Sequence, residues 1–170
     1  MKIKDVSNAQ IAKTKLDELF VSHPYPDPGT GKNPITIGYG TTFYFDTKKH
    51  VTMTDKPVDE VEGDRLLRGH YSTIVSPLVD KLCRDDLTQN EFDEVADFIY
   101  NAGATYIDKK GKVQYYNLFK NINAKMNQKD LTTYWESLAI TGGGKKLNGL
   151  ITRRKEEVEG YFKINNLKQK

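Results

Sequence analysis

Residues 25–45 read YPDPGTGKNPITIGYGTTFYF and differ in composition from the rest of the chain. The first ten residues are rich in proline and glycine, which is typical of a loop. From Ile35 onward, β-branched and aromatic residues predict strand and hairpin structure, with Gly38 and Gly40 at bends or close backbone contacts. The stretch is short, so the sheet that it predicts is small.

Helical patterns lie on both sides of this stretch. Before it, Ser7 and Asn8 are N-cap residue types, and we expect a first helix that stops before Pro24. The apolar stripe of that helix consists of Ala12, Leu16, Leu19 and Phe20. After the stretch, apolar residues recur at helical spacing from Pro57 onward. Breaks or turns are expected at Pro77, at 108–112 and at 142–144, and Thr88-Gln89-Asn90-Glu91 is a capping box.

The order of helix, small β segment and helical bundle predicts an α+β fold with segregated elements. The 170 residues fit a single domain, 1–170. Within it we expect a β-containing lobe at about 20–56 and a helical lobe at 57–165, with the first helix packing back on the helical lobe. Two such lobes create a cleft, which is the usual place for a ligand.

Composition excludes several classes of function. The 26 Lys and Arg residues exceed the 23 Asp and Glu residues by three and are spread along the chain, so we expect no nucleic-acid partner. Cys83 is the single cysteine, which rules out an internal disulfide and paired-cysteine zinc sites, and we expect it to be buried and inert. His23, His50 and His70 lack ligand spacing, so no metal site is predicted.

The first residues lack the apolar run of a signal peptide. No stretch approaches the ~20 apolar residues of a membrane span. We therefore expect synthesis in the cytoplasm without a membrane span, and a separate route of release if the protein acts outside.

Two carboxyl groups are candidates for acid–base chemistry. Glu18 lies near the end of the first predicted helix, Asp27 follows nine residues later in the loop, and Thr36 lies in the first predicted strand. Hydrolysis of a glycosidic bond needs one carboxyl kept protonated by an apolar setting and another kept ionised in a wetter one. Two acids at this spacing are common by chance, and Glu18 also fits an ordinary exposed helix position.

The wider pattern is more specific. Glu18, then Tyr25-Pro26-Asp27-Pro28, then Thr36-Ile37-Gly38-Tyr39-Gly40 resemble the active-site region of the phage-type lysozymes, glycoside hydrolase family 24. The similarity continues at 87–103, at 117–123 and at the Gly-Leu-x-x-Arg-Arg segment in 149–157. The resemblance implies a lysozyme-like fold, with a small β-hairpin lobe, a larger helical lobe and an active-site cleft between them.

The resemblance also implies an activity, namely cleavage of the β-1,4 bond between N-acetylmuramic acid and N-acetylglucosamine in peptidoglycan, which lyses bacterial cells. Glu18 would be the general acid. Asp27 would stabilise positive charge on the sugar or help to activate water, and Thr36 would position that water. No cofactor and no metal are implied.

Further expectations concern binding. Tyr100, Asn101 and Asn117 match family positions that face the cleft, which makes them candidate substrate-binding residues, although core packing also explains Tyr100. The partners expected are peptidoglycan glycan strands, and we expect a monomer. Arg153 and Arg154 fit two interpretations equally: they brace the last helix against Glu18, or they are solvated.

Three departures from the family pattern leave alternatives open. Leu19 replaces the glycine that usually follows the catalytic glutamate, and Thr41 replaces a histidine that tends to brace the site. The loop between Asp27 and Thr36 is longer than in many relatives by about three residues. One alternative is a non-catalytic peptidoglycan-binding module of a phage tail or conjugation machine, and a more distant one is a lytic transglycosylase.

Overall fold

A short capped helix begins the fold. In the computed structural model, which describes residues 2–26, 31–142 and 144–163, α1 spans Asn8–Glu18. The Ser7 side chain accepts a hydrogen bond from the Gln10 backbone N–H at 3.1 Å, as an N-cap serine does. Leu19 ends the helix with φ of 56°. The helix was predicted to stop before Pro24, but Leu19 already turns the chain out of the helix and Pro24 lies inside a strand.

The buried face of α1 consists of one apolar residue, Ile11, and two polar ones, so the predicted apolar stripe was wrong. Leu16 is 77% exposed and Leu19 is 66% exposed, whereas Gln10 and Thr14 are buried. The Thr14 hydroxyl lies 2.8 Å from the Tyr71 hydroxyl, and the Gln10 side-chain amide donates to Thr14 at 3.2 Å. Burial of these groups is tolerated because they satisfy one another's hydrogen bonds.

The predicted β segment from Ile35 onward supplies one strand of an antiparallel hairpin, and the other strand lies before it, where a helix end and a loop were expected. The two strands are β1 (Val21–Pro26) and β2 (Ile35–Gly38). Tyr25 lies opposite Thr36 in the register. The two predicted glycine bends are confirmed, since Gly38 and Gly40 have φ of 66° and 83°. Between them the chain turns back on itself, and the backbone groups of Ile37 and Thr41 exchange two hydrogen bonds at 2.9 Å.

A helical stretch follows, divided by an irregular turn. It consists of α2 (Glu60–His70), the π-helical turn η1 (Tyr71–Val75) and α3 (Ser76–Leu82). A break was predicted at Pro77, and the irregularity lies in the turn before it. Proline has no N–H to donate and its ring crowds the carbonyl four residues earlier, which favours a wider turn there. The apolar residues predicted at helical spacing do face the interior, since Leu67, Tyr71 and Val75 are buried.

The chain divides into two compact units. The N-terminal unit is Val6–Ser76, and the C-terminal unit comprises Met1–Asp5 and Pro77–Lys170. The single domain of 1–170, with lobes at about 20–56 and 57–165, stays a prediction, as does the cleft between the lobes.

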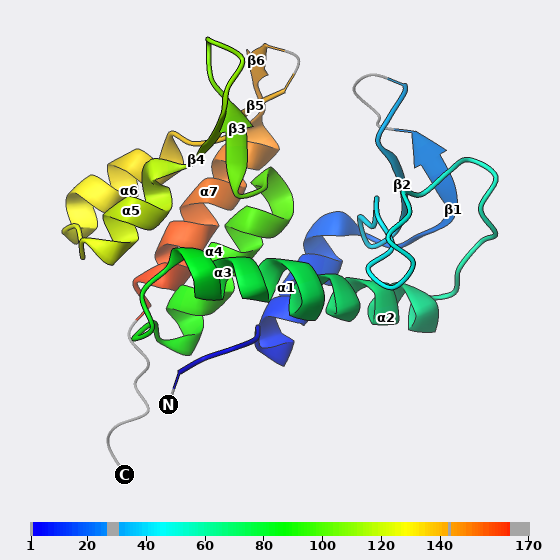
Figure 1. Ribbon diagram of the computed structural model, residues 1–170, viewed down its shortest axis with the longest axis horizontal. Coiled ribbons are helices and arrows are strands. Elements are labelled where there is room, and N and C mark those ends of the chain that lie inside the picture. Colours follow the sequence, from blue (N-terminus) through cyan, green and yellow to red (C-terminus); the bar gives the residue numbers. More distant parts are fainter. Residues whose placement is uncertain (1, 27–30, 143, 164–170) are drawn as a thin grey trace. The chain divides into compact units, whose positions relative to one another are not determined.

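Helices dominate the C-terminal unit. They are α4 (Gln89–Ala102), α5 (Asn117–Asn123), α6 (Gln128–Glu136) and α7 (Asn148–Tyr161). Helix α7 packs along α4, α6 packs on α7, and α5 packs on α6 (Figure 1). The Trp135 ring is fully buried and meets Phe98 edge to face, with centroids 6.1 Å apart. The capping box at the start of α4 is confirmed, since the Thr88 and Glu91 side chains each bond the other's backbone N–H.

Two small hairpins in this unit were not predicted as strands. The first pairs β3 (Thr105–Ile107) with β4 (Val113–Tyr115), and the second pairs β5 (Thr141–Gly142) with β6 (Lys145–Lys146). The turn at 108–112 was predicted, but strands of two or three residues are too short to show an alternating pattern. Residues 142–144 were expected to close a helix, yet α6 ends at Glu136 and Gly142 belongs to β5, while Gly143 lies outside the described residues.

The α+β class is confirmed by this mixture of helices and small hairpins. Within the described ranges, no helix is both long enough and apolar enough to cross a lipid bilayer.

Candidate active site

Glu18 stands at a place where the chain changes direction. It is the last residue of α1 and is half-buried. The backbone of Leu19 bonds back to the Lys15 carbonyl at 3.2 Å, and the chain then enters β1. This sharp exit from the helix places the Glu18 carboxyl beside the hairpin of the same unit.

Tyr25 links Glu18 to the hairpin. Partial burial raises the pKa of Tyr25, and the negative charge of Glu18 raises it further. Tyr25 also lies opposite Thr36 in the β1–β2 register, and Thr36 is 9% exposed. The fold therefore brings Glu18 and Thr36, two of the three predicted catalytic residues, to the same part of the N-terminal unit.

Tyr25 is a further candidate site residue, which the sequence pattern did not single out. Its signal was its position two residues before Asp27, within the motif that carried the resemblance. Asp27 itself, the second predicted carboxyl, lies outside the described residues.

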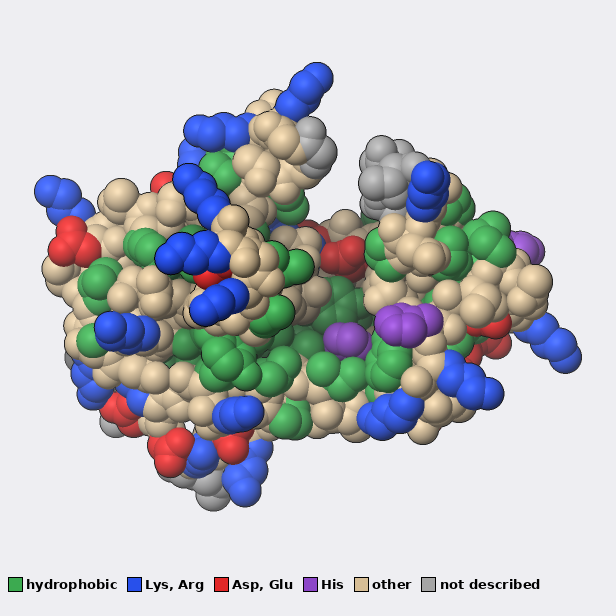
Figure 2. Space-filling model, turned by 45° about the horizontal axis from the view of Figure 1, so that its top comes forward, with side chains coloured by type: hydrophobic (Ala, Val, Ile, Leu, Met, Phe, Trp, Pro, Cys, Tyr) green, Lys and Arg blue, Asp and Glu red, His purple; other side chains and the backbone are tan. Residues whose placement is uncertain are grey.

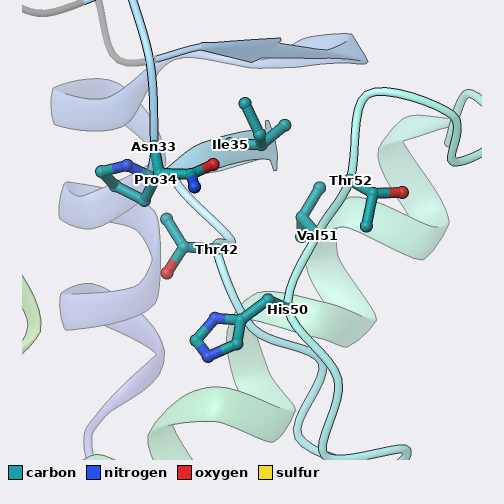
Figure 3. Close-up of a pocket in the computed structure, with 7 residues that line it drawn as sticks. All are labelled: Asn33, Pro34, Ile35, Thr42, His50, Val51 and Thr52. Carbon is teal, nitrogen blue, oxygen red and sulfur yellow. The ribbon is translucent and has the colours of Figure 1, made fainter.

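A pocket of about 580 Å³ opens on the N-terminal unit (Figure 3). One of the residues that line this pocket is Ile35, which precedes Thr36 in β2. Three apolar residues line it, Pro34, Ile35 and Val51, together with four residues that can form hydrogen bonds, Asn33, Thr42, His50 and Thr52. Apolar walls with a few convergent polar groups are typical of sites for small ligands.

The three predicted substrate-binding residues lie in the C-terminal unit. Tyr100 is half-buried near the end of α4, next to Asn101. The Asn101 side-chain oxygen accepts a hydrogen bond from Arg154 at 2.6 Å, so any bond to a sugar would come from its amide N–H groups. Asn117 is exposed at the start of α5 and its backbone N–H bonds Tyr134.

Arg153 and Arg154 are buried, so the solvated interpretation was wrong. Arg153 donates to Asp97 of α4 at 2.9 Å. Arg154 lies 2.6 Å from Glu157 and stacks on the Phe98 ring, 4.8 Å from its centroid. This cluster joins α7 to α4, while a bracing role toward Glu18 stays a prediction.

Comparison with known proteins identifies the family. Residues 15–157 match the phage lysozyme family. The chain belongs to the phage lysozyme family. It is 32% identical over 155 residues to the endolysin of Bacillus phage B103, an alignment that covers 90% of this chain and 52% of that relative. The chain thus spans about half the length of the curated relative that it matches.

Solved structures support the same fold for this phage lysozyme chain. The endolysin of an Escherichia coli phage, FAHEc1, is 24% identical and superposes with a TM-score of 0.71, covering 95% of this chain and 96% of that one. The muramidase domain of SpmX from Asticaccaulis excentricus is 22% identical, with a TM-score of 0.70, and 95% and 100% are covered. The expected lysozyme-like fold is therefore confirmed.

Two of the three departures from the phage lysozyme pattern, Leu19 and Thr41, have different structural consequences. Leu19 keeps the positive φ that a glycine would adopt without strain. Thr41 is 3% exposed, and its hydroxyl has no hydrogen-bond partner among the residues that the structure describes. Neither change removes Glu18 or Thr36. In the same described part of the chain, no cluster of three His, Cys, Asp or Glu residues could hold a metal ion.

Proposed function

We propose that this chain is a muramidase, an enzyme that cleaves the β-1,4 bond between N-acetylmuramic acid and N-acetylglucosamine in peptidoglycan. The observation that carries the proposal is the position of Glu18 at the end of α1, beside Tyr25 and the Thr36 strand, in a chain of the phage lysozyme family.

Each catalytic residue has a separate role in the proposal. Glu18 donates its proton to the oxygen of the leaving sugar, which requires a carboxyl that is protonated when the substrate binds. Asp27 stabilises positive charge at the reacting sugar carbon or helps to activate water. Thr36 holds that water through its hydroxyl group. The reaction consumes water and needs no cofactor.

The partner is the peptidoglycan glycan strand, bound by a monomer. Tyr100, Asn101 and Asn117 contact its sugars. The pocket beside β2 offers apolar walls and hydrogen-bonding groups, which suit an acetamido sugar. The protein acts on the wall of the host cell after release.

Glu18→Gln tests the proposal. The amide has nearly the same shape but cannot donate the catalytic proton, so hydrolysis should fall by at least about 10²–10⁴-fold. The measurement is the release of reducing ends from purified sacculi, with mass spectrometry of the fragments. Asp17→Asn is the matched control, because Asp17 is the exposed neighbour on the same helix and should tolerate the change.

Three outcomes would contradict the proposal. If Glu18→Gln hydrolyses sacculi as fast as the unaltered protein, Glu18 is not the general acid. Anhydro-sugar fragments would identify a lytic transglycosylase instead. Binding to sacculi without any release of reducing ends would identify a non-catalytic binding module.

A further inference from the structure

The β3–β4 hairpin has one face directed toward its own unit and one face directed away. In the antiparallel register, Thr105 lies opposite Tyr115 and Ile107 lies opposite Val113. Side chains of a strand alternate between the two faces, so these four share one face, and Tyr106 and Gln114 occupy the other. The Tyr106 ring packs on Tyr116, with centroids 5.0 Å apart, so this second face lies nearer the unit, although Tyr106 is 40% exposed and Gln114 is exposed as well.

The outward face is apolar and exposed. Ile107 is 72% exposed, Val113 is 68% exposed and Tyr115 is 50% exposed. Ile107 and Val113 are the pair next to the turn, whereas Tyr115 lies further from the tip. The hairpin thus presents an aliphatic pair near its tip and an aromatic ring behind it.

Lysines surround this tip. Lys109, Lys110 and Lys112 are exposed in the turn, and none of them makes an ion pair within the described ranges. The one acid of the turn, Asp108, is engaged locally: its carboxylate accepts the backbone N–H groups of Lys110 and Lys112 at 2.8 and 2.9 Å. These bonds lower the pKa of Asp108, with the Lys112 bond as the largest cause.

The β5–β6 hairpin adds to the same pattern. Lys145 and Lys146 are exposed, and Leu147 follows them with 45% of its surface exposed. Figure 1 shows both hairpins projecting on the same side of the C-terminal unit, and Figure 2 shows Lys and Arg side chains gathered there. Together the two turns hold five lysines and one aspartate, whereas the whole chain has an excess of only three positive charges.

We propose that the β3–β4 hairpin docks on the surface of an anionic lipid bilayer. Ile107 and Val113 would enter the boundary between headgroups and acyl chains, and Tyr115 would lie at the headgroup level, as interfacial tyrosines do. The lysines of the turn attract anionic headgroups, while their long side chains let the ammonium groups stay in water.

The exposed chemistry favours a bilayer over a polysaccharide as the occupant. Sugars are recognised through hydrogen bonds to their hydroxyl and amide groups and through stacking on aromatic rings, and Ile107 and Val113 offer neither. An aliphatic pair beside unpaired lysines is complementary to a surface that is negatively charged outside and apolar beneath. The docking is peripheral and weakens at high salt, because exposed charges are screened. It does not depend on the proposed hydrolysis.

Co-sedimentation with lipid vesicles tests the docking. The full chain should sediment with vesicles of phosphatidylglycerol and phosphatidylcholine, and much less with phosphatidylcholine alone. Lys109→Gln with Lys110→Gln should weaken binding by roughly 25-fold, since one lysine near an anionic surface contributes about fivefold. Ile107→Ser with Val113→Ser should also weaken binding while leaving the charge unchanged.

A matched control separates the hairpin from general charge. Lys48→Gln with Lys49→Gln removes two exposed lysines from a turn of the N-terminal unit and should leave vesicle binding unchanged. Circular dichroism verifies that each variant folds. Sacculi contain no lipid, so their hydrolysis is scored separately and its failure bears only on the proposed muramidase activity.

The docking proposal fails if the full chain does not sediment with the anionic vesicles. It also fails if the Lys48 and Lys49 control loses as much binding as the hairpin variant. The protein could instead be retained on sacculi through Ile107 and Val113 without binding vesicles. That result would show that this face holds a glycan.

Discussion

At the scale of single residues, Leu19 is the clearest point of conflict between sequence and backbone. Its φ of 56° and ψ of 156° fall in a region that is essentially restricted to glycine. The phage lysozyme pattern usually has glycine there, and the chain keeps the conformation with a leucine. Since the leucine side chain is 66% exposed, little packing offsets the strain.

Leu19→Gly should therefore raise the free energy of unfolding, by about 1 kcal/mol. Strain of about 1–3 kcal/mol is relieved, against about 0.5–1 kcal/mol for the greater freedom of glycine in the unfolded chain. Urea unfolding followed by circular dichroism measures the change. Leu19→Ala keeps the Cβ atom that causes the strain and should bring no such gain. A glycine variant no more stable than the unaltered protein would disprove the argument.

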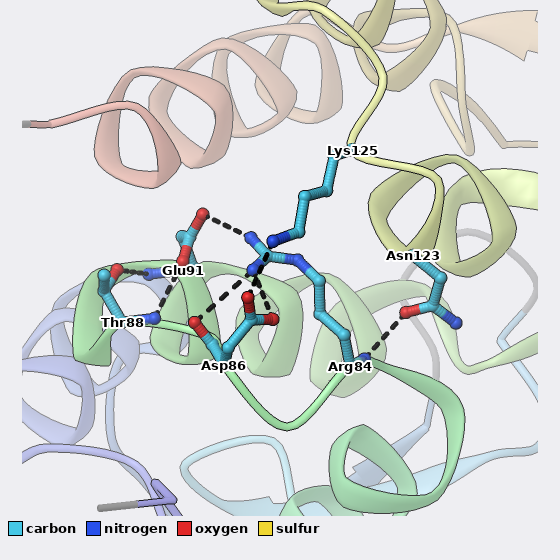
Figure 4. A network of polar contacts seen from close by, with 6 residues as sticks. All are labelled: Arg84, Asp86, Thr88, Glu91, Asn123 and Lys125. Carbon is cyan, nitrogen blue, oxygen red and sulfur yellow. Dashed lines mark hydrogen bonds and ion pairs between the residues drawn. The ribbon is translucent and has the colours of Figure 1, made fainter.

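At the scale of elements, a network of charges ties the connection between α3 and α4 to the end of α5 (Figure 4). Arg84 pairs with Asp86 at 2.6 Å and with Glu91 of the capping box at 2.8 Å. Lys125 pairs with Asp86 at 2.8 Å, and Asn123 accepts the Arg84 backbone N–H at 2.7 Å. The first turn of α4 is thus held by Arg84 as well as by its own cap, and Arg84 is itself fixed to the end of α5 through Asn123.

The network predicts a dependence of stability on pH. Hydrogen bonds from Lys125 and Arg84 lower the pKa of Asp86 from 3.8 to about 2. A carboxyl whose pKa is lowered by folding adds stability above its unfolded pKa and loses it as pH falls through the folded pKa. At pH 5, Asp86→Asn should have a lower free energy of unfolding than the unaltered protein. This difference should shrink between pH 4 and pH 2.

Urea unfolding of both proteins at pH 5, 4, 3 and 2 measures this difference. Glu156→Gln is the control, because Glu156 is an exposed carboxyl of α7 outside the network. If the difference in stability between Asp86→Asn and the unaltered protein stays constant down to pH 2, the pKa of Asp86 is not lowered by these partners.

At the scale of the whole molecule, the core of the C-terminal unit contains charges as well as apolar side chains. Glu157 accepts the Trp135 indole N–H at 2.7 Å and pairs with Arg154 at 2.6 Å, and both charged residues are fully buried. Trp135 comes from α6 and the pair from α7, while Arg153 reaches Asp97 of α4. Three helices therefore meet at one polar cluster.

Glu157→Leu should destabilise the protein by about 3–5 kcal/mol, because it removes the carboxyl paired with the buried Arg154 and leaves the indole N–H without its acceptor. Glu157→Gln keeps an acceptor for the indole and should cost less. Urea unfolding of the two variants gives the comparison. Equal stability of Glu157→Leu and the unaltered protein would show that the cluster tolerates loss of its acid.

The sequence of neighbouring residues was sufficient to predict the α+β class, the glycine bends and the α4 cap, because each depends on residues close in sequence. It also predicted the family, the position of Glu18 at a helix end and that of Thr36 in a strand, whereas the proximity of Tyr25 to both residues came only from the folded chain. The burial of Gln10 and Thr14 in α1 and of Arg153 and Arg154 in α7 depends on distant partners, Tyr71, Asp97 and Asn101. Hydropathy assigns polar residues to the surface, and only a folded chain can supply the hydrogen bonds and opposite charges that allow them inside.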